Sequence, residues 1–177
     1  VWMSEFEAAS GRLLVAGSYS AQQLSYSLWA LAALRLRPEA MWLAAARGAL
    51  AASAAAAAAA AATGTGAREA EGQTEAATAA DAQLVRGASG GLPSTQALAT
   101  MLWACVVLHV KLDAAAEAAV TAGLAARLAA EGATAGPQAL AMSLWACARL
   151  QVRPQRQLLA AWRGAASAEL LAAAPAR

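Results

Sequence analysis

The sequence predicts an all-α fold, an α-solenoid of stacked helix-turn-helix repeats, from three observations. A stretch with fixed positions occurs three times, over residues 20–38, 94–112 and 136–154. Each copy has a Gln, a Leu two residues later, a Leu-Trp-Ala triplet, a further Leu and a closing cation. Apolar residues within each copy follow helical spacing, and helix start and stop residues bracket the copies. Such self-similarity is typical of repeat proteins, whose units bury their apolar faces against one another.

Apolar residues three and four apart place a stripe along one side of each repeated helix. In the first copy the stripe consists of Leu24, Leu28, Leu31 and Leu34. The tryptophans of the triplets fall near the opposite side of the helix; they are Trp29, Trp103 and Trp145. A helix that is apolar on two sides must be covered on both, by a partner helix and by neighbouring repeats. We therefore expect these tryptophans to be core residues. We do not expect their rings to stack on the bases of an RNA.

Local signals mark the ends of the repeated helices. Ser20 and Ser94 suit the N-cap position, and the first serine is followed by Gln at the spacing of a capping box. Pro137 suits the first position of a helix. Pro38 and Pro154 are expected to stop the first helix of the outer copies, whereas the middle copy has no proline there.

A second, alanine-rich helix follows each copy, so the repeating unit is a helix pair. Residues 1–15 read as the second helix of a repeat whose first helix is missing. The expected organisation has four parts: a partial repeat plus the first full repeat over 1–50, a low-complexity Ala/Gly/Glu insert over 51–91, the second repeat over 92–135 and the third over 136–177. We expect the insert to bury no core. An unrecognisable extra unit in its place is the alternative, because the first two triplets are farther apart than the last two.

The pattern Gln-x-Leu-x-x-x-Leu-Trp-Ala, then Leu, a basic turn and Pro, resembles the octotricopeptide repeat. The third copy, Pro137 to Pro154, matches best, and the middle copy departs at Leu112, where the turn proline is absent. This family comprises helical-repeat proteins of green-algal chloroplasts and mitochondria. The resemblance implies binding of single-stranded organellar RNA, with roles in transcript stability, processing or translation, or in holding ribosomal RNA. It implies a mitochondrial protein, with the chloroplast as the alternative.

Composition sets further bounds. The net charge is +2 and the pI about 8.9, a mild basic bias that is compatible with nucleic acid but does not demand it. Hydrophobic residues make up 60% of the chain, but the abundance of alanine makes that figure overstate the core. We expect no membrane span, because no run of about 18 strongly apolar residues is present.

Nothing in the sequence resembles a catalytic constellation. His109 is the only histidine, and we expect it to have a turn or capping role at the end of its helix. Cys105 and Cys147 hold one position on the apolar stripe and are expected to be small core residues. The segment 63–66 lacks the Lys of a phosphate-binding loop. We therefore expect no enzyme, no cofactor, no metal and no small-molecule substrate.

Cations recur where each repeated helix ends. Arg37, Lys111 and Arg153 hold one repeat position, and Arg35 and Arg149 lie close by. They could complement the negative ends of their helices. They could also form a ladder of phosphate contacts along one edge of the stack, and one cation can do both. These five residues are the candidate RNA-binding cations.

Variable positions on the otherwise fixed helix are the second candidate set. Tyr26 is replaced by Thr100 and Met142 in the other copies. Helical-repeat RNA readers use such positions to meet individual bases, and a tyrosine can stack on one. Ordinary variation of a surface position is the alternative explanation.

Taken together, the observations and the resemblance predict a non-catalytic RNA-binding helical-repeat protein. The resemblance implies a structural subunit that holds ribosomal RNA beside other ribosomal proteins in a mitochondrial ribosome. Two alternatives stay open. One is an organellar factor for messenger RNA stability or translation. The other is a protein–protein scaffold without RNA contact, because helical solenoids bind peptides on the same surfaces.

Overall fold

The computed structural model describes residues 2–63 and 91–172, and this part of the chain is entirely helical, without a strand. The all-α class is thereby confirmed. The elements are α1 (Trp2–Val15), α2 (Ala21–Ala33), α3 (Ala40–Ala62), α6 (Thr95–Val107), α7 (Ala114–Glu131), the 3₁₀ helix η1 (Gly132–Ala135), α8 (Pro137–Leu150) and α9 (Arg156–Ala172). The insert beyond residue 63, up to residue 90, lies outside the described residues.

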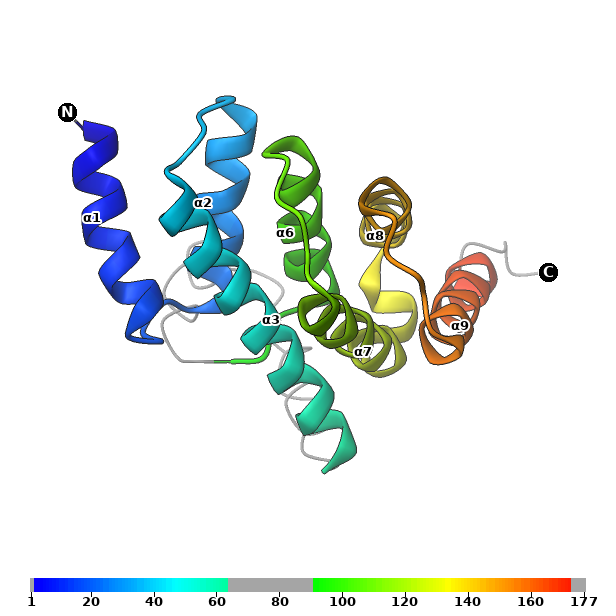
Figure 1. The fold of residues 1–177 in the computed structure, drawn as a ribbon. Helices are drawn as coiled ribbons and strands as arrows, with labels where there is room; N and C mark the ends of the chain where they lie inside the picture. The colour runs from blue at the N-terminus through cyan, green and yellow to red at the C-terminus, as the bar shows by residue number, and fades with distance from the viewer. Residues whose placement is uncertain (1, 64–90, 173–177) are drawn as a thin grey trace, which may run out of the picture.

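The helices lie in two rows (Figure 1). The three repeated helices form one row, in which α2 packs against α6 and α6 against α8. The second helices form the other row, in which α1 packs against α3, α3 against α7, and α7 against α9. Equivalent helices therefore meet equivalent neighbours, in the order of the chain.

The predicted start signals are present. The Ser20 hydroxyl accepts a hydrogen bond from the Gln23 backbone N–H at 3.2 Å, and the Ser20 N–H donates to Gln23 Oε1 at 2.9 Å, which completes the capping box. The Ser94 hydroxyl accepts from the Ala97 N–H at 3.1 Å. Pro137 occupies the first turn of α8. The two serines satisfy N–H groups that have no partner within the helix, and Pro137 has no N–H to satisfy.

All three repeated helices end in the same way, with one residue in the left-handed conformation. These residues have positive φ angles: Arg35 at 54°, His109 at 56° and Gln151 at 58°. The next N–H then donates back to the carbonyl five residues earlier, at 2.8 to 3.0 Å, in the pairs Leu36–Leu31, Val110–Cys105 and Val152–Cys147. This pattern is a Schellman motif, which satisfies carbonyl groups at a helix end. The middle copy forms it without a proline, so the proline is not what ends these helices.

The predicted leucine stripe forms the core. Leu24, Leu28 and Leu31 are buried, as are their equivalents in α6. The fourth stripe residue, Leu34, is instead exposed. It directly follows α2, whose side away from α6 is covered by no first-row helix in the described residues.

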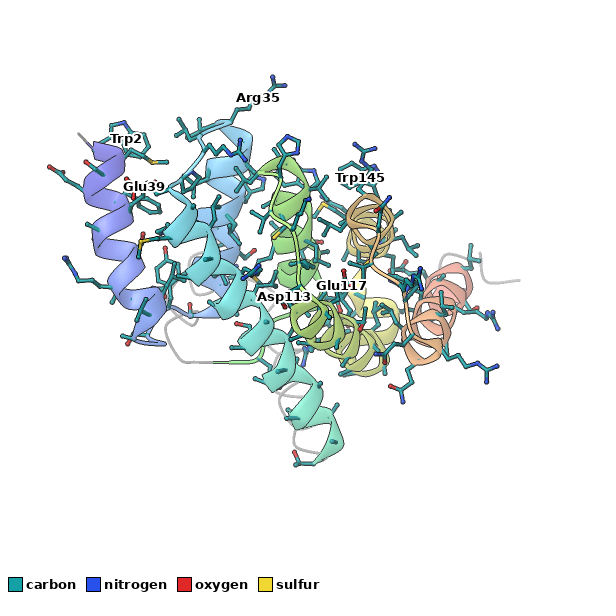
Figure 2. The ribbon with its side chains drawn as sticks, viewed as in Figure 1. Trp2, Arg35, Glu39, Asp113, Glu117 and Trp145 are labelled. Carbon is teal, nitrogen blue, oxygen red and sulfur yellow. The ribbon has the colours of Figure 1, made fainter. Side chains whose placement is uncertain are left out.

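The expectation that the repeated tryptophans are core residues is wrong for two of the three. Trp29 is 52% exposed and Trp145 45% exposed, while Trp103 is half-buried. Within residues 2–63 and 91–172 no further helix layer covers that side of the first row, so the tryptophans of its two outer helices meet solvent. Figure 2 shows Trp145 on the surface of α8.

Two other tryptophans are buried instead, one in α3 and one in α9. Trp42 Nε1 donates to the Ser10 hydroxyl at 2.8 Å, and Trp162 Nε1 donates to the Ser143 hydroxyl at 3.0 Å. Both serines are buried, and each tryptophan therefore has its polar atom satisfied within the core.

The longest packing contact joins α3 to α7. Gly123 lies so close to α3 that a Cβ added to it would stand 2.5 Å from the Ala54 carbonyl oxygen. Ala54 and Ala57 are buried, so residues 51–62 form an integral part of α3. The expectation of an insert that buries no core therefore does not hold for its first twelve residues.

A buried ion pair ties α7 to the start of α6. Glu131 Oε1 accepts hydrogen bonds from Arg127 Nε at 3.0 Å and Nη2 at 2.8 Å, and also from the Thr95 backbone N–H at 3.0 Å. Both charged side chains are largely buried. The glutamate therefore neutralises the arginine and caps the N-terminus of α6 at the same time.

The expectation that no segment could cross a membrane does not hold for α3 on length and composition. This helix of 23 residues contains an 18-residue window with a mean hydropathy of 1.4. The value comes mainly from alanine, a weakly apolar residue. One side of α3 is committed to the protein core through Trp42, Ala46, Leu50 and Ala54.

Candidate nucleic-acid interface

The candidate site is the turn edge, which we define as the three turns after the repeated helices, residues 34–38, 108–112 and 150–154. Each turn contains a left-handed residue that directs the chain from the first row to the second. The first two turns come together in space, because both line one pocket. The third follows α8, the helix packed against α6.

The pocket between the first two turns has a volume of about 430 Å³. Its lining consists of Arg35 and Arg37 from the first turn, with Val107, Leu108 and His109 from the end of α6. Two arginines and a histidine thus line one hollow together with two apolar residues. Guanidinium groups offer a fork of N–H donors that matches a phosphate, so this hollow suits an anion.

Backbone conformation positions these side chains. Arg35 and His109 are equivalent left-handed residues, both exposed. Because neither side chain packs into its own helix, each is free to project from the turn. Figure 2 shows Arg35 directed away from the helices at the end of α2.

All five cations of the predicted ladder are exposed. Besides the two arginines of the pocket, these are Lys111, Arg149 and Arg153. Arg149 lies in the last turn of α8. The structure thus leaves every predicted phosphate-binding cation accessible, and it joins two of them in one pocket.

The two acidic residues near this edge, Asp113 and Glu39, differ in what their carboxylates do. Asp113 Oδ1 accepts from the Ala116 N–H at 2.9 Å at the start of α7, and its other oxygen lies 3.5 Å from Arg47 Nη2. Glu39 follows the first turn, and its N–H donates to Glu7 Oε1 at 2.8 Å. The charge of Asp113 is therefore tied to a helix start and to one exposed ion pair, whereas the Glu39 carboxylate makes no capping hydrogen bond.

The variable positions do not join the cations. Tyr26 is exposed but lines a separate pocket between α1 and α2, which shares no residue with the turn pocket. Thr100 is half-buried, and its hydroxyl accepts from Gln96 Nε2 at 3.2 Å. Met142 is also half-buried. The cations and the predicted base-reading positions thus form two regions.

Sequence reasoning left His109 out of the candidate set and assigned it to its turn. The structure confirms the turn position and also places its side chain in the pocket lining beside both arginines. The available signal was its repeat equivalence to Arg35. Trp29 and Trp145 were likewise left out as core residues, and both are accessible for stacking.

The cysteines have the chemistry of core residues, as expected. Burial raises the pKa of the Cys105 thiol to about 12 and that of Cys147 to about 11. Both thiols are therefore protonated near neutral pH, and the thiol form neither attacks a substrate nor binds a metal. Within residues 2–63 and 91–172, no group of three or more His, Cys, Asp or Glu side chains could hold a metal ion.

Comparison with protein-family models, with curated proteins and with solved structures finds no match to this chain. The case for its function therefore depends on its own residues and their geometry.

Proposed function

We propose that this chain is a non-catalytic α-solenoid of the octotricopeptide-repeat type that binds organellar RNA along its turn edge. The observation that carries the proposal is the pocket in which Arg35, Arg37 and His109 meet. Phosphate contacts supply most of the affinity of such proteins for single strands. The arrangement of equivalent helices in two rows supports the solenoid description.

The RNA would follow the turns from one repeat to the next. Each turn contributes at least one exposed cation, and the fixed Schellman geometry gives each cation the same starting backbone. A polyanion with regularly spaced phosphates is the ligand that such a series of similar sites fits. We place the protein in a mitochondrion as a subunit that holds ribosomal RNA, because a short stack gains support from a larger assembly.

Salt dependence of binding tests this proposal. Affinity for a single-stranded RNA, measured by fluorescence anisotropy, should fall with salt, with a log–log slope of about −0.7 for each phosphate contacted. Replacing Arg35 and Arg37 together by Gln should make the slope less steep by about 1 to 2. Replacing Arg12 and Arg163 by Gln is the matched control, since both are exposed arginines of the second row.

Equal effects of the two double variants would show that only net charge matters and would contradict a site at the turn edge. A flat salt response would exclude RNA binding through phosphates altogether. Crosslinking the protein to RNA in the organelle would then separate ribosomal RNA from messenger RNA as its target.

A further inference from the structure

A second accessible region lies at the N-terminal end of the first row. It shares no lining residue with the turn pocket, although its Leu34 and Leu36 alternate in the chain with Arg35 and Arg37 of that pocket. This is the α1/α2 groove, a hollow of about 270 Å³. It is lined by Trp2 and Phe6 from α1, by Tyr26, Ser27, Ala30 and Leu31 from α2, and by Leu34 and Leu36 after α2. Trp2, Tyr26 and Leu34 are among the most exposed apolar side chains of the described residues. An apolar surface of this kind marks an interaction site.

The repeat supplies an internal control for what should cover this groove. Leu34 is 66% exposed in the first copy, but its equivalent in the second, Leu108, is only 4% exposed. Ala30 is half-buried, whereas its equivalents Ala104 and Ala146 are fully buried. Both positions are thus closed in the second copy. In the third copy Ala146 is buried and Leu150, the equivalent of Leu34, is half-buried. The helices α6 and α8 each follow another first-row helix.

The opposite face of the row shows the complementary pattern. Leu28 and Leu102 are 2% and 0% exposed, and their equivalent on α8, Leu144, is 46% exposed. The position that opens only on the last helix of the row faces the next helix along. The positions that open only on the first helix must therefore face a preceding one.

We propose that the α1/α2 groove binds an amphipathic α-helix with the pattern of α6 and α8, laid beside α2 as α2 lies beside α6. The occupant presents a leucine equivalent to Leu28 towards Ala30 and Leu34. Side chains of one helix fill hollows of another in this way. The interface continues one that the chain already forms twice, between α2 and α6 and between α6 and α8.

The position of α1 is consistent with a helix bound beside α2. Phe6 packs against Trp42 with ring centroids 5.9 Å apart, and Glu7 caps α3, so α1 is held to the second row. α1 therefore does not occupy the first-row place beside α2. Trp2 and Phe6 form the wall of that place, which a helix in the first row would contact in addition to α2.

A peptide in trans tests the proposal directly. A fluorescent peptide with the sequence of residues 136–153 is titrated into the intact chain, and anisotropy and far-UV circular dichroism are recorded. We expect saturable binding with a gain of helix. Ala30→Arg in the chain should weaken binding by at least about tenfold, the scale of a central interface residue. A peptide with Leu144→Asp should lose binding to a similar extent.

Leu144→Asp in the chain is the matched control, because it alters the exposed leucine at the other end of the row. It should leave peptide affinity unchanged. Loss of binding with this variant, together with full binding by the Ala30→Arg chain, would place the site at α8 and overturn the proposal. Equal binding of the Leu144→Asp peptide, or no saturable binding, would also overturn it.

Sedimentation velocity of the chain alone distinguishes a second copy as the occupant. We expect a monomer. Self-association that Ala30→Arg abolishes would show that a second copy of the chain occupies the groove, and it would overturn the proposal. RNA binding depends on Arg35 and Arg37, which the groove does not contain. Failure at the groove would therefore leave the proposed function intact.

Discussion

The middle helix pair, α6 and α7, differs from the pairs on either side in the contacts that stabilise it. Eight residues of α6 are buried, against five of α2 and five of α8. α7 contributes a glycine pressed against α3 and a buried ion pair that reaches the start of α6. Neither feature has a counterpart among the described residues of the outer pairs. The outer pairs instead expose apolar residues that the middle pair buries.

This difference separates two kinds of information in the sequence. The residues that recur in the copies specify what every unit needs alone, above all the leucine stripe of its first helix. Residues that do not repeat specify how one particular unit meets its neighbours. Variants that affect the two kinds of residue should therefore have different consequences, and the following measurements separate them.

The largest loss is expected from Glu131→Ala in the middle pair. It leaves the buried Arg127 guanidinium without its partner and removes the cap on the Thr95 N–H. Removing one partner of a buried ion pair typically costs about 3–5 kcal/mol. Urea unfolding followed by circular dichroism measures this free energy.

The control is Arg47→Gln, which breaks the more exposed pair with Asp113. Exposed pairs contribute about 0–1 kcal/mol, so this variant should unfold at nearly the parental urea concentration. Similar losses for the two variants would mean that burial does not distinguish the middle pair.

Tryptophan replacements compare repeated with non-repeated residues. Trp162→Ala should cost about 3–5 kcal/mol, because it empties a buried site and leaves the Ser143 hydroxyl without one partner. Trp145→Ala lies on the neighbouring helix α8 but removes a half-exposed ring, so its cost should be at most about 1 kcal/mol. The same unfolding measurement checks both, and a larger loss for the repeated tryptophan would contradict the structure.

Gly123→Ala tests the contact between α3 and α7. The added methyl group would overlap the Ala54 backbone, which cannot move as a flexible side chain does. Overpacking of this kind costs about 1–3 kcal/mol.

Two other helical glycines provide controls of opposite sign. Gly48 and Gly164 have nothing within 4 Å of an added Cβ. Their replacement by Ala should stabilise the protein by about 0.5–1 kcal/mol, because alanine favours the helix. A stabilising Gly123→Ala would show that the two helices can separate without cost.

The parts of this molecule that the sequence could predict are those decided within about one helical turn. Capping at Ser20, the start of α8 at Pro137 and the leucine stripe all depend on residues close in the chain. The exposure of Trp29 and Trp145 could not be predicted in this way, because it depends on whether another layer of helices covers the row. The contact of Gly123 with Ala54 joins residues far apart in the chain, and no local pattern records it.

The candidate site also has a part that the sequence could predict and a part that it could not. The five cations were predictable from their repeat positions, and all are exposed as a binding role requires. The pocket that Arg35, Arg37 and His109 share was not predictable from the sequence, because it depends on how two turns approach each other. Prolines 38 and 154 suggested how the helices end, but the left-handed residue decides it, and its identity differs in every copy.

The smallest expected effect comes from these left-handed residues, and it separates stability from binding. A residue other than glycine is strained at a φ of 54° to 58°, so Arg35→Gly and Gln151→Gly should each stabilise the fold by about 0.5–1 kcal/mol. Both changes relieve the same backbone strain, but only the first removes a cation from the pocket. Arg35→Gly should therefore gain stability and lose RNA affinity, whereas Gln151→Gly should gain stability alone. A loss of RNA affinity in both variants would attribute binding to the shape of the turns, and parental affinity in both would exclude Arg35 from the interface.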